Sequence, residues 1–284
     1  VSPDSIASLA AVVQLASEYD YGIIPWGSGT KMDIGLPPTR ADIVVQLDRM
    51  NQVLEYEPAD QAITVQAGIR LSDLQSHLGS QGQYWPLDPP HGETCTLGGI
   101  LATNASGLLR MTFGTARDIV IGLRVVQADG TIVKSGGKVV KNVAGYDLNK
   151  MYIGSLGTLG IMAEITLKLQ PLPEIGHIII GVLPSIYTAM DTAFKLLESD
   201  VMPTFIELAN PVLIAILSRQ VGGNSIDAGF PIIAGIMGQG ETVKWQVGAC
   251  ERLFQEMGAG QIVHMEDERY QIALKSLRSF PTGQ

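Results

Sequence analysis

Residues 88–107 carry the strongest chemical pattern in this 284-residue chain. They read Asp-Pro-Pro-His-Gly-Glu-Thr-Cys-Thr-Leu-Gly-Gly-Ile-Leu-Ala-Thr-Asn-Ala-Ser-Gly. Because few bulky side chains project from this run, its backbone N–H groups can lie directly against a large ligand. The same small residues also allow a helix and a strand to pack tightly without a ligand. The segment alone does not decide between these readings.

A short apolar strand that enters a glycine-rich loop, residues 23–31, has the chemistry of an anion site. Gly27 and Gly29 can adopt positive φ angles, and the Lys31 ammonium group can neutralise an anion held by backbone amides. Neither Gly-x-x-x-x-Gly-Lys nor a helix-opening Gly-x-Gly-x-x-Gly occurs here. The loop therefore suits a pyrophosphate, and a glycine-rich β-turn is the alternative.

A third element comprises residues 141–148 (Lys-Asn-Val-Ala-Gly-Tyr-Asp-Leu) and 153–161 (Ile-Gly-Ser-Leu-Gly-Thr-Leu-Gly-Ile). In this order the three elements resemble the FAD-binding domain of the vanillyl-alcohol oxidase and p-cresol methylhydroxylase superfamily, over about residues 2–173. The resemblance implies an α+β, two-subdomain FAD-binding fold. It also implies that the first loop holds the FAD pyrophosphate, that the Gly-Gly segment lies along pyrophosphate and flavin, and that the last glycines meet the cofactor again.

The resemblance assigns cofactor-binding residues to all three elements. They are Pro25, Trp26, Gly27, Ser28, Gly29, Thr30, Lys31, Pro89, Thr94, Thr96, Leu97, Gly98, Gly99, Thr103, Ser106, Gly107, Asn142, Gly160 and Ile161. Members with covalent flavin place a histidine where this chain has Thr30, so we expect FAD to be bound non-covalently. The three intact glycine loops argue against a subunit that has lost FAD, because nothing but ligand approach is expected to explain all three together.

Some residues of the chain resemble one branch of the superfamily and others resemble a second branch. Pro-Pro-His at residues 89–91 and the 141–148 run look like the E subunit of bacterial glycolate oxidase. The larger D-type subunits and D-lactate dehydrogenases usually carry Glu where this chain has Leu156, whereas residues 102–107 are closer to the D-type enzymes. We expect the chain to be closest to the E subunit.

The resemblance implies an FAD-dependent oxidoreductase that acts on CH–OH groups. The first hypothesis is an FAD-binding subunit of a glycolate (2-hydroxyacid) oxidase complex, which carries flavin for oxidation of the acid and passes electrons to a partner. The expected partners are a catalytic flavoprotein subunit and an iron–sulfur subunit, and the substrate is glycolate or D-lactate. The alternative is a self-sufficient FAD-linked D-lactate or D-2-hydroxyacid dehydrogenase whose C-terminal catalytic part lies outside this chain.

Oxidation of a 2-hydroxy acid needs a base for the hydroxyl proton and a cation for the carboxylate. His91, in a cofactor motif, is a weak candidate for the base, and a loop histidine satisfied by backbone partners is the favoured reading. For Arg110 and Arg117 surface or ion-pair roles are at least as well supported. Lys275 and Arg278 on the last predicted helix receive no assignment.

The other histidines show no metal-ligand spacing. His77 is expected on the solvent-facing side of a helix, and His177 and His264 are expected in core or edge positions of strands. The sequence therefore predicts no metal site.

Composition narrows the class of protein further. The net charge is −9, 46% of residues are hydrophobic and 17% are charged. These values indicate a well-buried globular protein and exclude a basic nucleic-acid-binding surface. No apolar run reaches the roughly 18–20 residues that span a bilayer. Cys95 and Cys250 give neither an iron–sulfur motif nor a disulfide framework, so we expect a cytoplasmic protein that meets membranes only through partners.

Apolar periodicity predicts the elements that position these loops. The FAD-binding domain, residues 1–173, is expected to contain helices at 5–19 and 71–79, and strands near 21–25, 43–48, 52–57, 61–67, 119–128, 131–135 and 161–170. In the cap, residues 174–284, strands at 177–183, 204–209, 231–237 and 260–265 should alternate with helices at 185–199, 211–219, 241–258 and 266–278.

This order suggests a ferredoxin-like α+β cap, which we expect to be incomplete. Val1 is not an initiator methionine, and family members continue past the point where this chain stops. We therefore expect a part of a longer protein.

Overall fold

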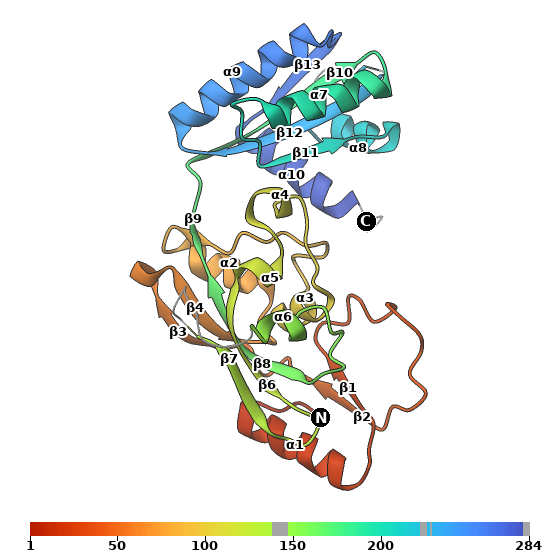
Figure 1. Cartoon of the computed structure of the whole chain (residues 1–284), viewed down its shortest axis with the longest axis vertical. Coiled ribbons are helices and arrows are strands. Elements are labelled where there is room, and N and C mark those ends of the chain that lie inside the picture. The colour runs from red at the N-terminus through yellow and green to blue at the C-terminus, as the bar shows by residue number, and fades with distance from the viewer. Residues whose placement is uncertain (138–146, 222–225, 228, 281–284) are drawn as a thin grey trace. The chain divides into compact units, whose positions relative to one another are not determined.

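The computed structural model describes residues 1–137, 147–221, 226–227 and 229–280, and it forms two compact units (Figure 1). The first unit contains Val1–Ser106 and Phe113–Pro171, and the second contains Gly107–Thr112 and Leu172–Gln284. The short segment Gly107–Thr112 packs with the second unit, where the Thr112 hydroxyl donates a hydrogen bond to the Thr204 carbonyl at 3.0 Å. Local sequence patterns gave no sign of this excursion.

A five-stranded antiparallel sheet in the order β3-β4-β8-β6-β7 lies at the centre of the first unit. Its strands are β3 (Val53–Glu57), β4 (Ala62–Gln66), β6 (Val120–Val126), β7 (Ile132–Gly136) and β8 (Ile161–Lys168). The predicted turn between β3 and β4 is confirmed as a 3-10 turn at Pro58–Asp60. The predicted hairpin between β6 and β7 is also confirmed, and there the Asp129 carboxylate accepts a hydrogen bond from the Thr131 N–H at 2.9 Å.

Two small strand pairs complete the β-structure of the first unit. Strands β1 (Ile23–Trp26) and β2 (Ile43–Gln46) run parallel, and β5 (Gln83–Tyr84) pairs with β9 (Gln170–Pro171). The pairing of β1 with β2 continues one step further, because the Leu47 N–H donates to the Trp26 carbonyl at 3.0 Å. This bond fixes the point at which the loop after β1 begins.

The helices of the first unit include two that the sequence predicted and others that it did not. They are α1 (Ile6–Glu18), α2 (Leu71–Gly79), α3 (Leu97–Thr103), α5 (Ala116–Ile119) and α6 (Asn149–Tyr152), with α4 (Arg110–Phe113) at the boundary between the units. The Ser5 hydroxyl caps α1, and the Thr96 hydroxyl caps α3 by accepting the Gly99 N–H at 3.3 Å. Helix α3 escaped sequence prediction because each glycine lowers helix propensity by about 1 kcal/mol relative to alanine.

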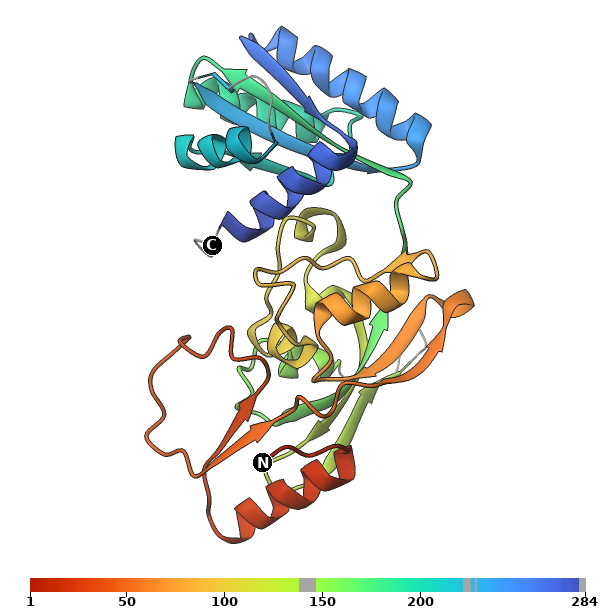
Figure 2. The same cartoon turned by 180° about the vertical axis from the view of Figure 1, so that it is seen from behind.

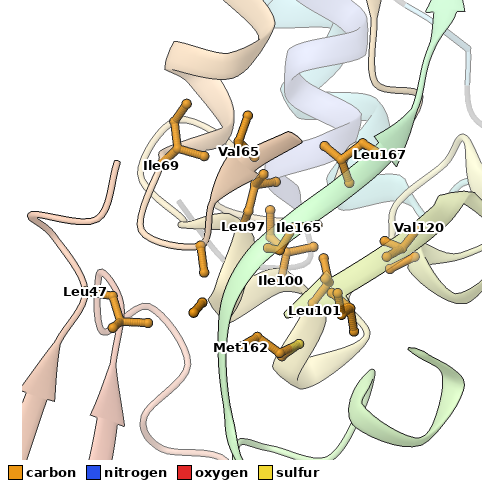
Figure 3. Close-up of a cluster of buried hydrophobic side chains, with 14 of the residues drawn as sticks. Leu47, Val65, Ile69, Leu97, Ile100, Leu101, Val120, Met162, Ile165 and Leu167 are labelled. Atoms are coloured by element: carbon orange, nitrogen blue, oxygen red, sulfur yellow. The ribbon is translucent and has the colours of Figure 1, made fainter. Parts of the chain in front are cut away.

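The buried side of α3 joins the helix to the sheet. Leu97, Ile100 and Leu101 are fully buried and belong to the same apolar cluster as the sheet residues Val65 and Ile165, as Figure 3 shows. Burying leucine and isoleucine side chains stabilises by roughly 1.5–3 kcal/mol each. The apolar side of α3 is thus held against the sheet, and the opposite side of the helix carries its small residues.

The second unit contains a four-stranded antiparallel sheet in the order β11-β12-β10-β13. Its strands are β10 (Ile175–Leu183), β11 (Phe205–Leu208), β12 (Phe230–Gly238) and β13 (Gln261–Met265), and its long helices are α7 (Ile186–Glu198), α8 (Pro211–Val221), α9 (Gly240–Glu256) and α10 (Asp267–Ser279). In chain order the first strand of this sheet lies between the third and the fourth, as in ferredoxin-like folds. The predicted fold is confirmed, with the predicted helix α8 between β11 and β12.

Helices cover both faces of this sheet (Figure 2). An apolar core lies between the sheet and the helices on each face. Ile179 faces the core shared with α7 and α9, whereas the neighbouring Ile178 and Ile180 face the core shared with α8 and α10. Alternation of side chains along one strand produces this division. Because β10 is central and covered on both sides, it is nearly continuously apolar, as the sequence predicted.

Candidate cofactor site

A pocket in the first unit brings the three predicted glycine-rich segments together. Its lining includes every predicted residue of the first loop, four of the second segment and two of the third. These residues are Pro25, Trp26, Gly27, Ser28, Gly29, Thr30, Lys31, Thr96, Gly98, Gly99, Thr103, Gly160 and Ile161. Segments far apart in sequence therefore meet at one site, as the ordered motifs implied.

Five of the predicted residues do not line this pocket. Leu97 points into the core, and Pro89 is buried outside the lining. Thr94 is exposed, and Ser106 and Gly107 lie where the chain passes to the second unit. The prediction treated the segment as a continuous strip along a ligand, whereas a helix presents only one of its sides. Asn142 lies outside the described residues.

Sequence reasoning missed other lining residues, most of them neighbours of predicted ones. They are Ile24, Met32, Ile34, Leu47, Cys95, Ile100, Ala102, Leu156, Gly157 and Met162. Leu47 and Met162 had no motif to mark them. Leu47 reaches the pocket because it follows β2, which pairs with β1. Met162 reaches it because it is the second residue of β8, directly after the pocket residue Ile161.

Helix α3 presents its small residues to the pocket. Gly98, Gly99, Ala102 and Thr103 lie on the side opposite its buried leucines. A Cβ on Gly99 would meet only the Thr96 hydroxyl, at 3.3 Å, whereas a Cβ on Gly98 would lie 3.1 Å from the Ala67 carbonyl oxygen. Packing against Ala67 therefore explains why residue 98 is glycine. Packing inside the protein gives no comparably strong reason for glycine at residue 99. An alanine methyl there would occupy space beside the pocket.

Internal packing also explains several other glycines. A Cβ on Gly27 would overlap the Thr96 hydroxyl, and a Cβ on Gly29 (φ +74°) would lie 2.8 Å from the Trp26 ring. Gly160 has a φ of +150°, and a Cβ there would lie 2.9 Å from the Val126 carbonyl oxygen. The expectation that only ligand approach explains the three loops is therefore wrong, because close contacts among the loops also require these glycines.

Lys31 supplies the positive charge of the pocket lining. Its ammonium group donates a hydrogen bond to the Thr103 hydroxyl at 3.4 Å, and desolvation lowers the Lys31 pKa below its usual value. The nearby Cys95 thiol is buried, and burial raises its pKa to about 11, so it is protonated at neutral pH. A partly desolvated cation on a glycine-rich loop is suited to bind an anion such as phosphate.

The end of α3 is fixed by the segment that precedes β8. The Gly154 N–H donates to the Leu101 carbonyl at 2.9 Å, and the Leu156 N–H donates to the Ala102 carbonyl at 2.8 Å. Beside these bonds, Asn104 Oδ1 and Ser155 Oγ are buried and have no hydrogen-bond partner in the described part of the chain. Buried polar atoms in native proteins nearly always have a partner, but neither residue lines the pocket.

The candidate catalytic residues lie outside the pocket lining. His91 has a φ of +62° in a turn where its carbonyl accepts the N–H groups of Thr94 and Cys95. Arg110 and Arg117 are exposed, and neither they nor His91 line the pocket. The bonds from Thr94 and Cys95 are accepted by the His91 backbone carbonyl, so the favoured non-catalytic reading of its side chain stays a prediction.

The remaining histidines differ in their surroundings. His77 is exposed on α2, which confirms the expectation, and its ring lies 5.5 Å from that of Tyr56. His177 and His264 form a close pair across adjacent strands, which their separation in sequence concealed. Within the described residues, no group of three or more His, Cys, Asp or Glu side chains could hold a metal ion. No helix in the described part of the chain is long and apolar enough to cross a membrane.

Comparisons with known proteins agree with this geometry. Residues 1–136 match the family described as "FAD binding domain". The glycolate oxidase subunit GlcD of Bacillus subtilis is 32% identical over 98% of this chain and 59% of its own length. D-lactate dehydrogenase [cytochrome], mitochondrial, of Arabidopsis thaliana is 32% identical over 80% of this chain and 40% of its own length. The chain thus spans roughly half the length of these relatives.

The crystal structure of p-cresol methylhydroxylase with substrate bound has the same fold. The TM-score is 0.79 with 16% sequence identity, and the match covers 99% of this chain and 62% of that one. Fold and site together define an FAD-binding domain of the p-cresol methylhydroxylase and vanillyl-alcohol oxidase type. The chain is similar, at 32% identity, to FAD-linked oxidoreductases that include a glycolate oxidase subunit and a D-lactate dehydrogenase.

Proposed function

We propose that the first unit binds FAD non-covalently in the pocket between the loop 25–31, helix α3 and the start of β8. The observation that carries this proposal is the meeting of three ordered glycine-rich segments around the half-buried Lys31. The loop 27–31 would hold the pyrophosphate through backbone N–H groups and the Lys31 ammonium. Gly98 and Gly99 would lie along the pyrophosphate and flavin. Thr30 stands where covalent relatives have histidine, which supports non-covalent binding.

Bound FAD would supply the acceptor for a hydride from the carbon that bears the hydroxyl group. The residues of this chain would hold and orient that acceptor. Ile24, Leu47 and Met162 would exclude water from one side of the site. The base for the hydroxyl proton and the cation for the carboxylate would come from residues outside the lining described here.

We further propose that the whole protein oxidises a 2-hydroxy acid, with glycolate and D-lactate as the first substrates to test. The names of the relatives that match most of this chain support that substrate class. These relatives include the D-type subunit of glycolate oxidase and a D-lactate dehydrogenase, which favours a catalytic flavoprotein over the accessory E-type subunit. Two buried free thiols, Cys95 and Cys250, are consistent with the cytoplasmic location that we propose.

The accessory role remains the second candidate because the described lining of the pocket contains no histidine or arginine. In that role the chain would carry flavin and pass electrons between a catalytic flavoprotein and an iron–sulfur partner. The E-subunit resemblance of residues 89–91 and 141–148 supports this reading.

A visible spectrum of the purified full-length protein, followed by anaerobic glycolate and D-lactate, separates the candidates. Two results together would support the autonomous dehydrogenase: acid precipitation releases the flavin from the protein, and glycolate or D-lactate bleaches the flavin absorption. An oxidised flavin that neither acid reduces would support the accessory subunit. A colourless protein that also fails to take up added FAD would overturn the cofactor proposal.

A further inference from the structure

His177 and His264 form a close imidazole pair in the second unit. His177 is on β10 and His264 is on β13, where His264 lies opposite Ile179 in the antiparallel register. Residues 177 and 179 share one face of the sheet, so the two histidines are diagonal neighbours on that face. His177 Nε2 lies 3.0 Å from His264 Nδ1, and the rings are nearly perpendicular at 79°. The pair is independent of the flavin pocket.

Each imidazole has a carboxylate beside its outer nitrogen. Glu266, the N-cap of α10, has its Oε2 3.7 Å from His177 Nδ1, and Glu251 on α9 has its Oε2 3.8 Å from His264 Nε2. A carboxylate attracts the N–H of the facing nitrogen, so it favours the tautomer with its hydrogen on the outer side. The two inner nitrogens lie within hydrogen-bond distance of each other, and the tautomer decides which of them would donate. When both hydrogens are on the outer nitrogens, both inner nitrogens present lone pairs that one cation can join.

We propose that His177 Nε2 and His264 Nδ1 bind one divalent transition-metal ion, with Zn²⁺ as the reference ion. Imidazole nitrogens suit zinc, nickel and copper, and a Zn–N bond is about 2.0–2.1 Å long. Two nitrogens bound to the same ion therefore lie roughly 3 Å apart or slightly more, which agrees with the observed distance. Glu251 and Glu266 would act as the carboxylates that orient ligating histidines.

The surroundings of the pair support this assignment. The His177 side chain is 11% exposed and the His264 side chain 35%, which leaves one side open to solvent. No group of three or more potential ligands occurs in the described chain, so water would complete the coordination shell. Such a site binds more weakly than a four-ligand structural zinc site.

Calorimetric titration of the purified chain with ZnCl₂ tests the proposal. We expect one site in the wild-type protein and at least a tenfold loss of affinity in His177→Gln and in His264→Gln. His77→Gln, which removes an exposed histidine of the first unit, is the matched control and should bind as the wild type does. Equal zinc affinity in His264→Gln and the wild type would overturn the proposal, and so would the absence of zinc binding.

A second measurement protects the test from variants that fail to fold. Cu²⁺ bound to the wild-type protein should give an electron paramagnetic resonance spectrum with coupling to two imidazole nitrogens. Glu251→Gln, which keeps the size of a half-exposed side chain, should weaken metal binding without loss of helical circular dichroism. A spectrum with one coupled nitrogen or none would show that the two imidazoles do not share the ion, and this would also overturn the proposal. Either result is independent of FAD binding.

Discussion

The hydroxyl of Thr96 occupies the space that a side chain on Gly27 would need. The same hydroxyl caps α3 by accepting the Gly99 N–H. One atom therefore both excludes a side chain at Gly27 in the first loop and stabilises the N-terminus of the helix in the second segment. Two of the glycine-rich segments are therefore fitted to each other before any ligand binds. Substitutions at Gly27 and Thr96 should therefore have coupled effects on stability.

Gly27→Ala should lower the free energy of unfolding by about 1–3 kcal/mol, the usual cost of overpacking. Adding Thr96→Ala should recover part of this loss, because it removes the oxygen that the new methyl group meets, although the lost cap itself costs about 1 kcal/mol. Thr96→Val is the matched control, since in the same rotamer it keeps a methyl group at the place of the hydroxyl. Urea unfolding of the apoprotein measures each variant, and additive effects in Gly27→Ala/Thr96→Ala would contradict the coupling.

Gly99→Ala should separate cofactor binding from folding. The new methyl group meets only the Thr96 hydroxyl inside the protein, and alanine favours a helix by about 1 kcal/mol over glycine, so stability should stay equal or rise. FAD affinity should fall at least tenfold because the methyl group enters the pocket. Flavin fluorescence titration checks this, with Gly79→Ala in α2 as the control whose Cβ meets nothing within 4 Å. Wild-type FAD affinity in Gly99→Ala would refute the proposed pose.

Lys31→Met should weaken FAD binding about tenfold and reduce the salt dependence of binding, because it removes the cation of the pocket lining. The apoprotein should be as stable as the wild type or more so, since desolvation lowers the pKa of Lys31 and its charged form is unfavourable there. Lys134→Met, an exposed site on β7 of the same unit, should change neither quantity. Salt-dependent FAD titrations of both variants provide the test.

The buried thiols predict a loss of stability in alkaline solution. Burial raises the pKa of Cys95 to about 11 and that of Cys250 to about 12, whereas both thiols titrate near 8.5–9 in the unfolded chain. The unfolded state therefore loses protons first, and the stabilisation present below pH 8.5 falls as pH rises toward 11. The expected decrease between pH 8 and pH 10 is on the order of 1–2 kcal/mol per thiol. Urea unfolding at several pH values should show that the free energy of unfolding of Cys250→Ala falls less steeply with pH than that of the wild type. An equal fall in both proteins would refute the prediction for Cys250.

Leu156→Gly should stabilise the apoprotein by about 1 kcal/mol. Leu156 has a φ of +55°, a conformation that costs an L-residue roughly 1–2 kcal/mol, and its side chain is 49% exposed, so little packing is lost. Leu159→Gly is the matched control: it is 48% exposed in the same segment, and its φ is not positive. That variant should lose stability, and thermal unfolding of both distinguishes them. Destabilisation of both variants to the same degree would contradict the strain at Leu156.

Sequence by itself determined most of the strands and long helices and the three segments that line the pocket. The helix α1 and the strands β1 and β10 depend on residues within a few positions of each other, and apolar periodicity records such local relations directly. Lys31 and the glycines beside it were predictable for the same reason, because the chemistry of a loop depends on residues that are adjacent in sequence. Even the ferredoxin-like order of the second unit followed from the alternation of elements along the chain.

Tertiary structure alone decided which residues meet. Nothing local indicates that Leu47 and Met162 line the same pocket, that Gly107–Thr112 packs with the second unit, or that His177 lies 3.0 Å from His264. The helix at residues 97–103 likewise forms because its leucines are buried against a sheet whose strands lie elsewhere in sequence. Burial outweighs the weak helix propensity of two glycines, and burial is a property of the fold, not of a sequence window.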